Sequence, residues 1–312
     1  MLAFAASRLV RLIVVVIGAT LITFTLLRLA GDPATVLLPV FATPEQRAQL
    51  SESLGLDRSL PEQYLSYVGH AAVGDFGESW KYRQPAGGLV LSRYAATLEL
   101  VGYGLALSLA LAVVLAIFGA RREGRIGDGI VIGFSLGARA IPSFWLGTLL
   151  ILVFSVKLGW LPTSGRGSPQ QLIMPVVTIA LFFVAEFTLV LRTSLLEAFK
   201  ADYVRAARAK GLSERSVTLR HAARNSVGPL LAVVAVNFGA LLGGTVIVEN
   251  VFAWPGLGRL AVEAVGQTDY PVVQATVLLL ALTIAVVSMV IEVAQGYIDP
   301  RVRRRASGAS HG

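Results

Sequence analysis

Few residues in this sequence could carry covalent or acid–base chemistry, and their spacing assembles no catalytic site. One pattern matches the G-x-S-x-G nucleophile elbow of serine hydrolases: Gly133-Phe134-Ser135-Leu136-Gly137. That elbow needs a strand-to-helix turn and a histidine base, whereas this pattern lies inside a long apolar run without histidine. We therefore interpret Gly133 and Gly137 as a small face for close helix packing, with a serine hydrolase as the alternative.

The sequence also lacks the residue patterns that bind nucleotides or metal ions. A phosphate-binding P-loop requires a lysine directly before Ser or Thr, but Lys81, Lys157, Lys200 and Lys210 precede Tyr, Leu, Ala and Gly. The chain has no cysteine, and its three histidines are far apart in the sequence. We predict no catalytic residue, no metal site and no cofactor in this chain. Any ATP and Mg²⁺ used with it must be bound by another subunit.

Four polar residues stand inside long apolar runs. They are Arg139, Glu186, Asn237 and Glu249. An ionised group at the centre of a membrane costs at least about 2.5–3.5 kcal/mol, so such groups face protein or water. The sequence predicts that these residues line a polar translocation path. Pairing between them, or with a second protein chain, is the alternative for Arg139 and Glu186.

The apolar runs themselves predict an all-α integral membrane protein. Of the 312 residues, 55% are hydrophobic and only 15% are charged, against about 25% charged in soluble domains. Six runs are long enough to cross a bilayer as helices: residues 9–29, 98–120, 130–156, 172–196, 229–248 and 273–298. The net charge of +8 falls between these runs and forms no aromatic-interleaved patch, so we exclude nucleic acid as a partner.

The basic residues between the runs predict the orientation. Arginine and lysine accumulate on the cytoplasmic side of a membrane protein. They concentrate in the N-terminus, in the second-to-third and fourth-to-fifth connections and in the tail, which all fall on one side if there are six spans. We predict cytoplasmic termini and four parts: residues 1–29 with the first helix, an extracytoplasmic segment 30–97, a five-helix core 98–298 and a basic tail 299–312.

Two connections are too long to be turns. In the outside segment 30–97, residues 44–54 are predicted to form a helix capped by Thr43, and the segment is interpreted as a docking surface. In the inside segment 197–227, helix-forming residues up to Ala209 precede Gly211, and a second helix from Ser213 is predicted to end near Asn225. A helix, a glycine turn and a helix predict a rigid protrusion that binds a cytoplasmic protein.

At this inside loop the sequence resembles the permease subunits of ATP-binding-cassette importers, which carry an "EAA" motif. Ala206, Ala207 and Gly211 match that motif, whereas Arg205 stands where its glutamate is expected. The dipeptide, oligopeptide and nickel branch of the family, B-type, is the closest in pattern. Its further matches are Gly31-Asp32-Pro33, Pro142-Ser143-Phe144-Trp145-Leu146-Gly147, Val251-Phe252-Ala253-Trp254-Pro255-Gly256-Leu257-Gly258, Asp269-Tyr270-Pro271 and Asp299-Pro300-Arg301.

The resemblance implies a function and a set of partners. The chain would be one permease of an importer for short peptides, nickel chelates or glutathione in a bacterial inner membrane. Its partners would be a second permease, two ATPase subunits or one fused ATPase, and an external solute-binding protein. The residues implied to dock on the ATPase are Asp202, Tyr203, Ala206, Ala207, Lys210, Gly211 and Leu212. The alternative is an ATPase-independent channel or an ion-coupled carrier.

Overall fold

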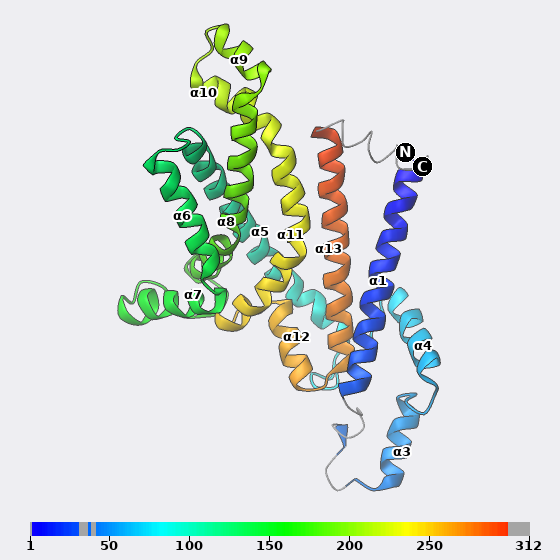
Figure 1. Cartoon of the computed structure of the whole chain (residues 1–312). Coiled ribbons are helices and arrows are strands. Elements are labelled where there is room, and N and C mark those ends of the chain that lie inside the picture. The colour runs from blue at the N-terminus through cyan, green and yellow to red at the C-terminus, as the bar shows by residue number, and fades with distance from the viewer. Residues whose placement is uncertain (1, 31–36, 39–41, 299–312) are drawn as a thin grey trace. The chain divides into compact units, whose positions relative to one another are not determined.

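The computed structural model describes residues 2–30, 37–38 and 42–298, and the regular elements of that part of the chain are helices (Figure 1). Their bounds are α1 Leu2–Ala30, α3 Pro44–Ser53, α4 Leu60–Ala72, α5 Ala86–Ala120, α6 Ile126–Ala140, α7 Ser143–Leu150, η1 Ile151–Lys157, α8 Pro169–Lys200, α9 Asp202–Ala209, α10 Glu214–Ser216, η2 Val217–Ala222, α11 Ala223–Val251, α12 Leu257–Gly266 and α13 Tyr270–Ile298. The chain divides into two compact units: Met1–Thr97 with Pro255–Val286, and Leu98–Trp254 with Val287–Gly312.

The predicted helical membrane protein is confirmed, with a difference in the third span. In the described residues, five helices are long and apolar enough to cross a bilayer, and a bent pair makes up to six. The run predicted at 130–156 is not one straight helix, because α6 and the α7–η1 helix meet at 95°. Pro142 lacks an N–H and disfavours helical geometry at the preceding residue, where Ile141 is extended (φ −86°, ψ 120°). The apolar run is thus broken within its length.

In the first unit, the segment after α1 folds as two helices. The helix predicted from Pro44 is confirmed, since Thr43 and Gln46 form a capping box at the start of α3. In α4, hydrogen bonds from Ser59 lower the pKa of Glu62 in the same kind of box. The second predicted span, residues 98–120, lies within a longer helix, because α5 already begins at Ala86.

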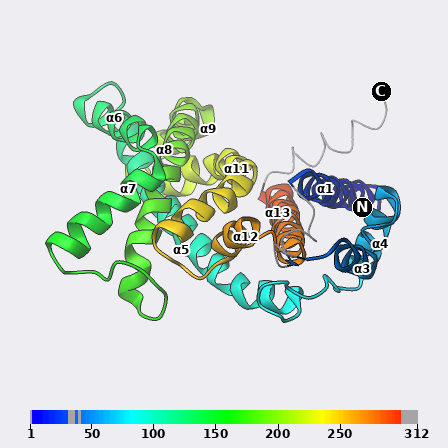
Figure 2. The same cartoon turned by 90° about the horizontal axis from the view of Figure 1, so that it is seen from below.

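Helix α4 lies beside α1 in both views (Figures 1 and 2). The hydroxyl of Tyr64 is 3.0 Å from Oγ1 of Thr20, and its ring meets that of Phe24 edge to face at 5.5 Å. Thr20 lies in the middle of the Val10–Leu29 span. Part of the segment interpreted as lying outside the membrane therefore packs at the depth of the first span.

A buried carboxylate organises the rest of the first unit. Asp269, in the turn between α12 and α13, is 1% exposed. Its carboxylate accepts the hydroxyl of Ser79 at 2.5 Å and the backbone N–H groups of Trp80 and Lys81 at 3.2 and 3.4 Å. This explains the Asp269-Tyr270-Pro271 motif, because the aspartate ties the turn before α13 to the loop before α5.

In the second unit, a buried ion pair joins α6 to α8. Arg192 donates from Nε to Oδ1 of Asp128 at 2.6 Å and from Nη2 to Oδ2 at 2.5 Å, and the N–H of Gly124 donates to the same carboxylate. The two side chains are 15% and 7% exposed. The Arg192 guanidinium is therefore held between α6 and α8, inside the bundle.

The helix that contains the fifth span begins inside the segment 197–227 rather than after it. The second helix of that segment was predicted to end near Asn225, before Pro229. Instead Pro229 lies within α11, and Glu214–Val251 forms one continuous helix with a π-helical turn at η2. Proline removes one backbone hydrogen bond but does not end the helix here.

Some sequence predictions fall outside the described residues. These are the Gly31-Asp32-Pro33 and Asp299-Pro300-Arg301 motifs and the basic tail 299–312.

The buried pair predicts a test of the fold. Asp128→Asn removes the negative partner of a buried guanidinium, so the unfolding free energy should fall by about 3 kcal/mol. The matched control is Glu123→Gln, because Glu123 and Lys200 form an exposed pair at 3.6 Å that is worth at most about 1 kcal/mol. Thermal unfolding of the detergent-purified complex measures both changes. Equal losses in the two variants would contradict the role given to Asp128.

Candidate functional site

The loop between α8 and α11 forms a compact helical hairpin at one end of these two helices (Figure 1). Helix α8 ends at Lys200, Ala201 is extended, and α9 follows. Gly211 has φ +74°, the left-handed geometry that glycine adopts without strain. Ser213 then accepts a hydrogen bond from the N–H of Ser216 and starts the helix that returns to the membrane. The predicted glycine turn and the Ser213 cap are confirmed.

One face of α9 is buried within the hairpin itself. Val204, Ala207 and Val217 form a small apolar cluster, and Val204 and Val217 are fully buried. A larger residue at 207 would push α9 away from η2. The sequence interpretation had Ala207 and Ala206 approach a partner together, whereas only Ala206 is exposed.

The other predicted docking residues lie on the outside of the hairpin. The exposed ones are Asp202, Tyr203, Ala206, Lys210, Gly211 and Leu212. A bidentate ion pair closes the turn beneath them, with Nε of Arg208 at 2.8 Å and Nη2 at 3.2 Å from the carboxylate of Glu214. The hydrogen bond to the Glu214 carboxylate raises the pKa of the Arg208 guanidinium. The hairpin is therefore a preformed surface.

Three of the four predicted path residues come together in the second unit. Nη1 of Arg139 lies 3.6 Å from Oε2 of Glu186, and Nδ2 of Asn237 donates to Oε1 of Glu186 at 3.0 Å. Arg139 is in the last turn of α6, just before the break at Pro142, whereas Glu186 and Asn237 lie within α8 and α11. The break thus ends α6 at the position where its cation meets Glu186.

The side chains of this cluster are accessible, and the contact between Arg139 and Glu186 is loose. The side chain of Arg139 is 60% exposed and that of Glu186 is 32% exposed. A pair at 3.6 Å in such surroundings stabilises the fold by less than about 1 kcal/mol. The cluster therefore presents a cation, an anion and an amide on accessible side chains.

Glu249 does not belong to this cluster. It is fully buried, and it lies 12 residues beyond Asn237 on α11, which is about 18 Å along a helix. Its carbonyl accepts the N–H of Trp254 at 2.8 Å in the turn that follows. That turn contains the V-F-A-W-P-G motif, with Phe252 and Trp254 buried and Ala253 at φ +48°. The structure places Glu249 in the support of this turn.

The catalytic alternative finds no support in the described residues. Ser135 lies on helix α6, is fully buried, and its hydroxyl has no hydrogen-bond partner in that part of the chain. A β-carbon added at Gly133 or Gly137 would meet no described atom within 4 Å, so the close packing predicted for these glycines is not formed there. No group of histidine and carboxylate side chains suited to a metal ion occurs in residues 2–30, 37–38 and 42–298.

Sequence reasoning missed Asp128 entirely and found Asp269 only as part of a motif, without the role of these two carboxylates in holding the helices together. Each had a local signal. Asp128 stands in the first turn of a helix, where an acid is favoured, and Asp269 directly precedes the helix that starts at Tyr270. Their partners, Arg192 and the loop at Ser79, are 64 and 190 residues away in the chain, and no local pattern identifies them.

Two family models cover most of the chain. Residues 112–304 match the binding-protein-dependent transport system inner membrane component, and residues 1–101 match the N-terminal part of such membrane components. The chain belongs to this family. It is a multi-pass permease component of the bacterial inner membrane and has no enzymatic role of its own. A binding-protein-dependent importer also includes ATPase and solute-binding partners.

Relatives of this permease match it over almost its full length. It is 36% identical over 335 residues to the di/tripeptide transport system permease protein DppB of Pseudomonas aeruginosa (strain UCBPP-PA14), covering 98% of this chain and 100% of the relative. It is 38% identical over 308 residues to the glutathione transport system permease protein GsiC of Escherichia coli (strain K12), covering 97% and 99%.

Solved structures share the fold. The MetNI methionine ABC transporter in inward-facing conformations matches with a TM-score of 0.50 and 21% identity, over 69% of this chain and 96% of that one. An amino acid ABC transporter crystallised with histidines matches with a TM-score of 0.50 and 16% identity, over 69% and 94%.

The hairpin geometry predicts a graded series at Gly211. No described atom lies within 4 Å of an added β-carbon, so a substitution there is opposed by the backbone and not by a clash. Gly211→Val should destabilise the turn by about 1–2 kcal/mol, and Gly211→Asn should cost less because asparagine tolerates left-handed geometry. Protease cleavage rates within residues 202–216 of the assembled permease measure the difference. Equal cleavage rates of the two variants would contradict the view that the left-handed geometry at residue 211 sets the cost of a substitution.

Proposed function

We propose that this permease forms half of the translocation path of a short-peptide importer and receives its ATP-driven movement through the α9 hairpin. The observation that carries the proposal is the continuity of Glu214–Val251, which joins the hairpin to the span that holds Asn237. The related di/tripeptide and glutathione permeases support peptides as the substrate class. A second, similar permease would complete the path, and two separate ATPases or one fused ATPase would bind the hairpins.

The orientation proposed for this assembly has both termini in the cytoplasm. The supporting observation is the charge of the hairpin, where basic side chains from Lys200 to Arg224 accumulate next to the membrane. With the hairpin inside, the order of the spans along the chain puts α3 and the turn at Asp269 on the opposite side. That side is where the solute-binding protein would deliver its cargo.

The Arg139–Glu186–Asn237 cluster is proposed as a polar site that the solute contacts along the translocation path. Peptides and glutathione carry an ammonium and a carboxylate, and the cluster presents one group of each opposite charge. Because the pair is loose and accessible, a passing zwitterion can replace protein contacts with its own at little cost. A tight buried pair, like Asp128–Arg192, would resist such an exchange.

Variants of the two neighbouring alanines of α9, Ala206 and Ala207, should distinguish a loss of ATPase docking from a loss of hairpin folding. Ala206→Trp adds bulk on the exposed face, so uptake should fall about tenfold or more, since overpacking costs roughly 1–3 kcal/mol, while the hairpin stays protected from protease. Ala207→Trp should lose both uptake and protection, because Ala207 is buried against Val217. Dipeptide uptake and ATPase co-purification are the measurements.

The control for these variants is Ala72→Trp, at an exposed alanine at the end of α4. It should leave ATPase binding unchanged. Wild-type uptake and ATPase binding by Ala206→Trp would contradict docking through this face. Uptake by the purified chain alone, without any ATPase, would instead establish a channel or an ion-coupled carrier.

The polar cluster predicts coupled effects on transport. Arg139→Gln and Glu186→Gln should each reduce dipeptide uptake about tenfold, the usual worth of a hydrogen bond to a charged group. The double variant should be less impaired than the product of the two, because the residues contact each other. Arg166→Gln is the control, since Arg166 pairs with Glu99 outside the cluster. Unchanged uptake in both single variants, at normal membrane abundance, would exclude the cluster from the path.

A further inference from the structure

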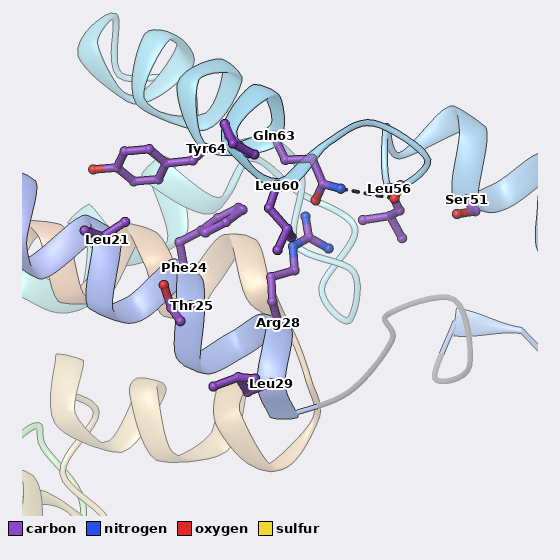
Figure 3. Close-up of a pocket in the computed structure, with 11 residues that line it drawn as sticks. Leu21, Phe24, Thr25, Arg28, Leu29, Ser51, Leu56, Leu60, Gln63 and Tyr64 are labelled. Atoms are coloured by element: carbon purple, nitrogen blue, oxygen red, sulfur yellow. Dashed lines mark hydrogen bonds between the residues drawn. The ribbon is translucent and has the colours of Figure 1, made fainter.

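An open cavity of about 670 Å³ lies between α1 and the helices α3 and α4, within the first unit. Figure 3 shows Phe24 and Arg28 of α1 and Leu60 of α4 directed toward one another around it. The Arg139–Glu186–Asn237 cluster and the α9 hairpin contribute no residue to this cavity. The ligand of the cavity must therefore be inferred from the residues that line the cavity.

The depth of the cavity follows from the helix that forms one wall. Its α1 residues run from Leu21 to Leu29, the second half of the Val10–Leu29 span. At 1.5 Å per residue this wall is about 12 Å long and extends from the middle of the bilayer to its surface. The cavity therefore opens where acyl chains lie at one end and headgroups at the other.

The lining changes character along the same direction. Leu21, Phe24 and Leu60 form an apolar wall. At the surface end, Arg28 reaches the cavity with its guanidinium carbon 5.3 Å from the centroid of the Phe24 ring. An apolar channel with a cation at the membrane surface is complementary to a hydrocarbon chain that ends in a phosphate.

A further polar group at this end also points to a ligand. Gln63 donates from Nε2 to the carbonyls of Leu56 and Arg58, at 3.0 and 2.8 Å, which fixes the orientation of its amide. Its Oε1 is buried and has no hydrogen-bond partner among the described residues. A buried acceptor without a donor is unfavourable, and a headgroup hydroxyl or ammonium would supply that donor by displacing the atoms that now cover the oxygen.

We propose that this cavity binds one phospholipid of the surrounding leaflet. Its acyl chain lies along Leu21 and Phe24, its phosphate meets Arg28, and a donor of its headgroup reaches Gln63. The lipid fastens α3 and α4 to the first span. This proposal depends on the membrane location of the chain and is independent of the transported solute.

The test is native mass spectrometry of the complete importer, extracted in detergent and supplied with dioleoyl phosphatidylglycerol. The wild type should retain this lipid in preference to dioleoyl phosphatidylcholine, whose headgroup has no donor, and to diacylglycerol, which has no phosphate. Arg28→Gln should lower retention about tenfold, because a charge-assisted contact is lost. Leu60→Trp, at an exposed position of the wall, should lower it by filling the space.

The matched control is Arg47→Gln, which removes the same charge from an exposed site on α3 that does not line the cavity. It should retain lipid like the wild type. Equal retention by all variants would overturn the proposal, as would displacement of the lipid by glycerophosphoglycerol, which lacks acyl chains. Displacement by a dipeptide would identify the cavity as a solute site instead. Variants are compared only at equal yield of assembled importer.

Discussion

A backbone inside hydrocarbon has to satisfy its own hydrogen bonds, and this requirement explains where the helices of the permease run and where they stop. The long helices meet it along their length. Where a helix ends, side chains take over: Asp269 accepts the N–H groups of Trp80 and Lys81, and Thr97 accepts that of Leu257 at 2.8 Å. Because these side chains take the place of backbone acceptors, the turns can be buried. One of these turns contains Thr268 at φ +55°.

The two groups of charges in the second unit differ in what their surroundings allow. Asp128 and Arg192 are almost completely enclosed and meet in a bidentate geometry, so neither can separate from the other without a large cost. Arg139 and Glu186 are exposed and further apart. The first pair fixes α6 against α8, and this fixed contact holds the second pair in place at the end of α6.

The sequence was sufficient for those features that depend on local patterns. Hydrophobic length predicted the crossing helices, Thr43 and Ser213 predicted helix starts, and Gly211 predicted a turn. Features that depend on distant partners were missed or misjudged. Nothing near Ala207 indicates that it packs on Val217. Pro229 was interpreted as the end of a helix, because a proline signal alone does not report the tertiary contacts that keep α11 continuous.

The unbroken helix from Glu214 to Val251 has a mechanical consequence. Glu214 and Asn237 are 23 residues apart on it, a distance of about 35 Å along the axis. Both residues therefore lie on one rigid secondary-structure element, the kind of element that carries coupling between distant sites where such coupling exists. Its compliant points are the π-helical turn Val217–Ala222 and Pro229, close to the tip. The part of the helix that follows Pro229 contains Asn237, the residue that α11 contributes to the polar cluster.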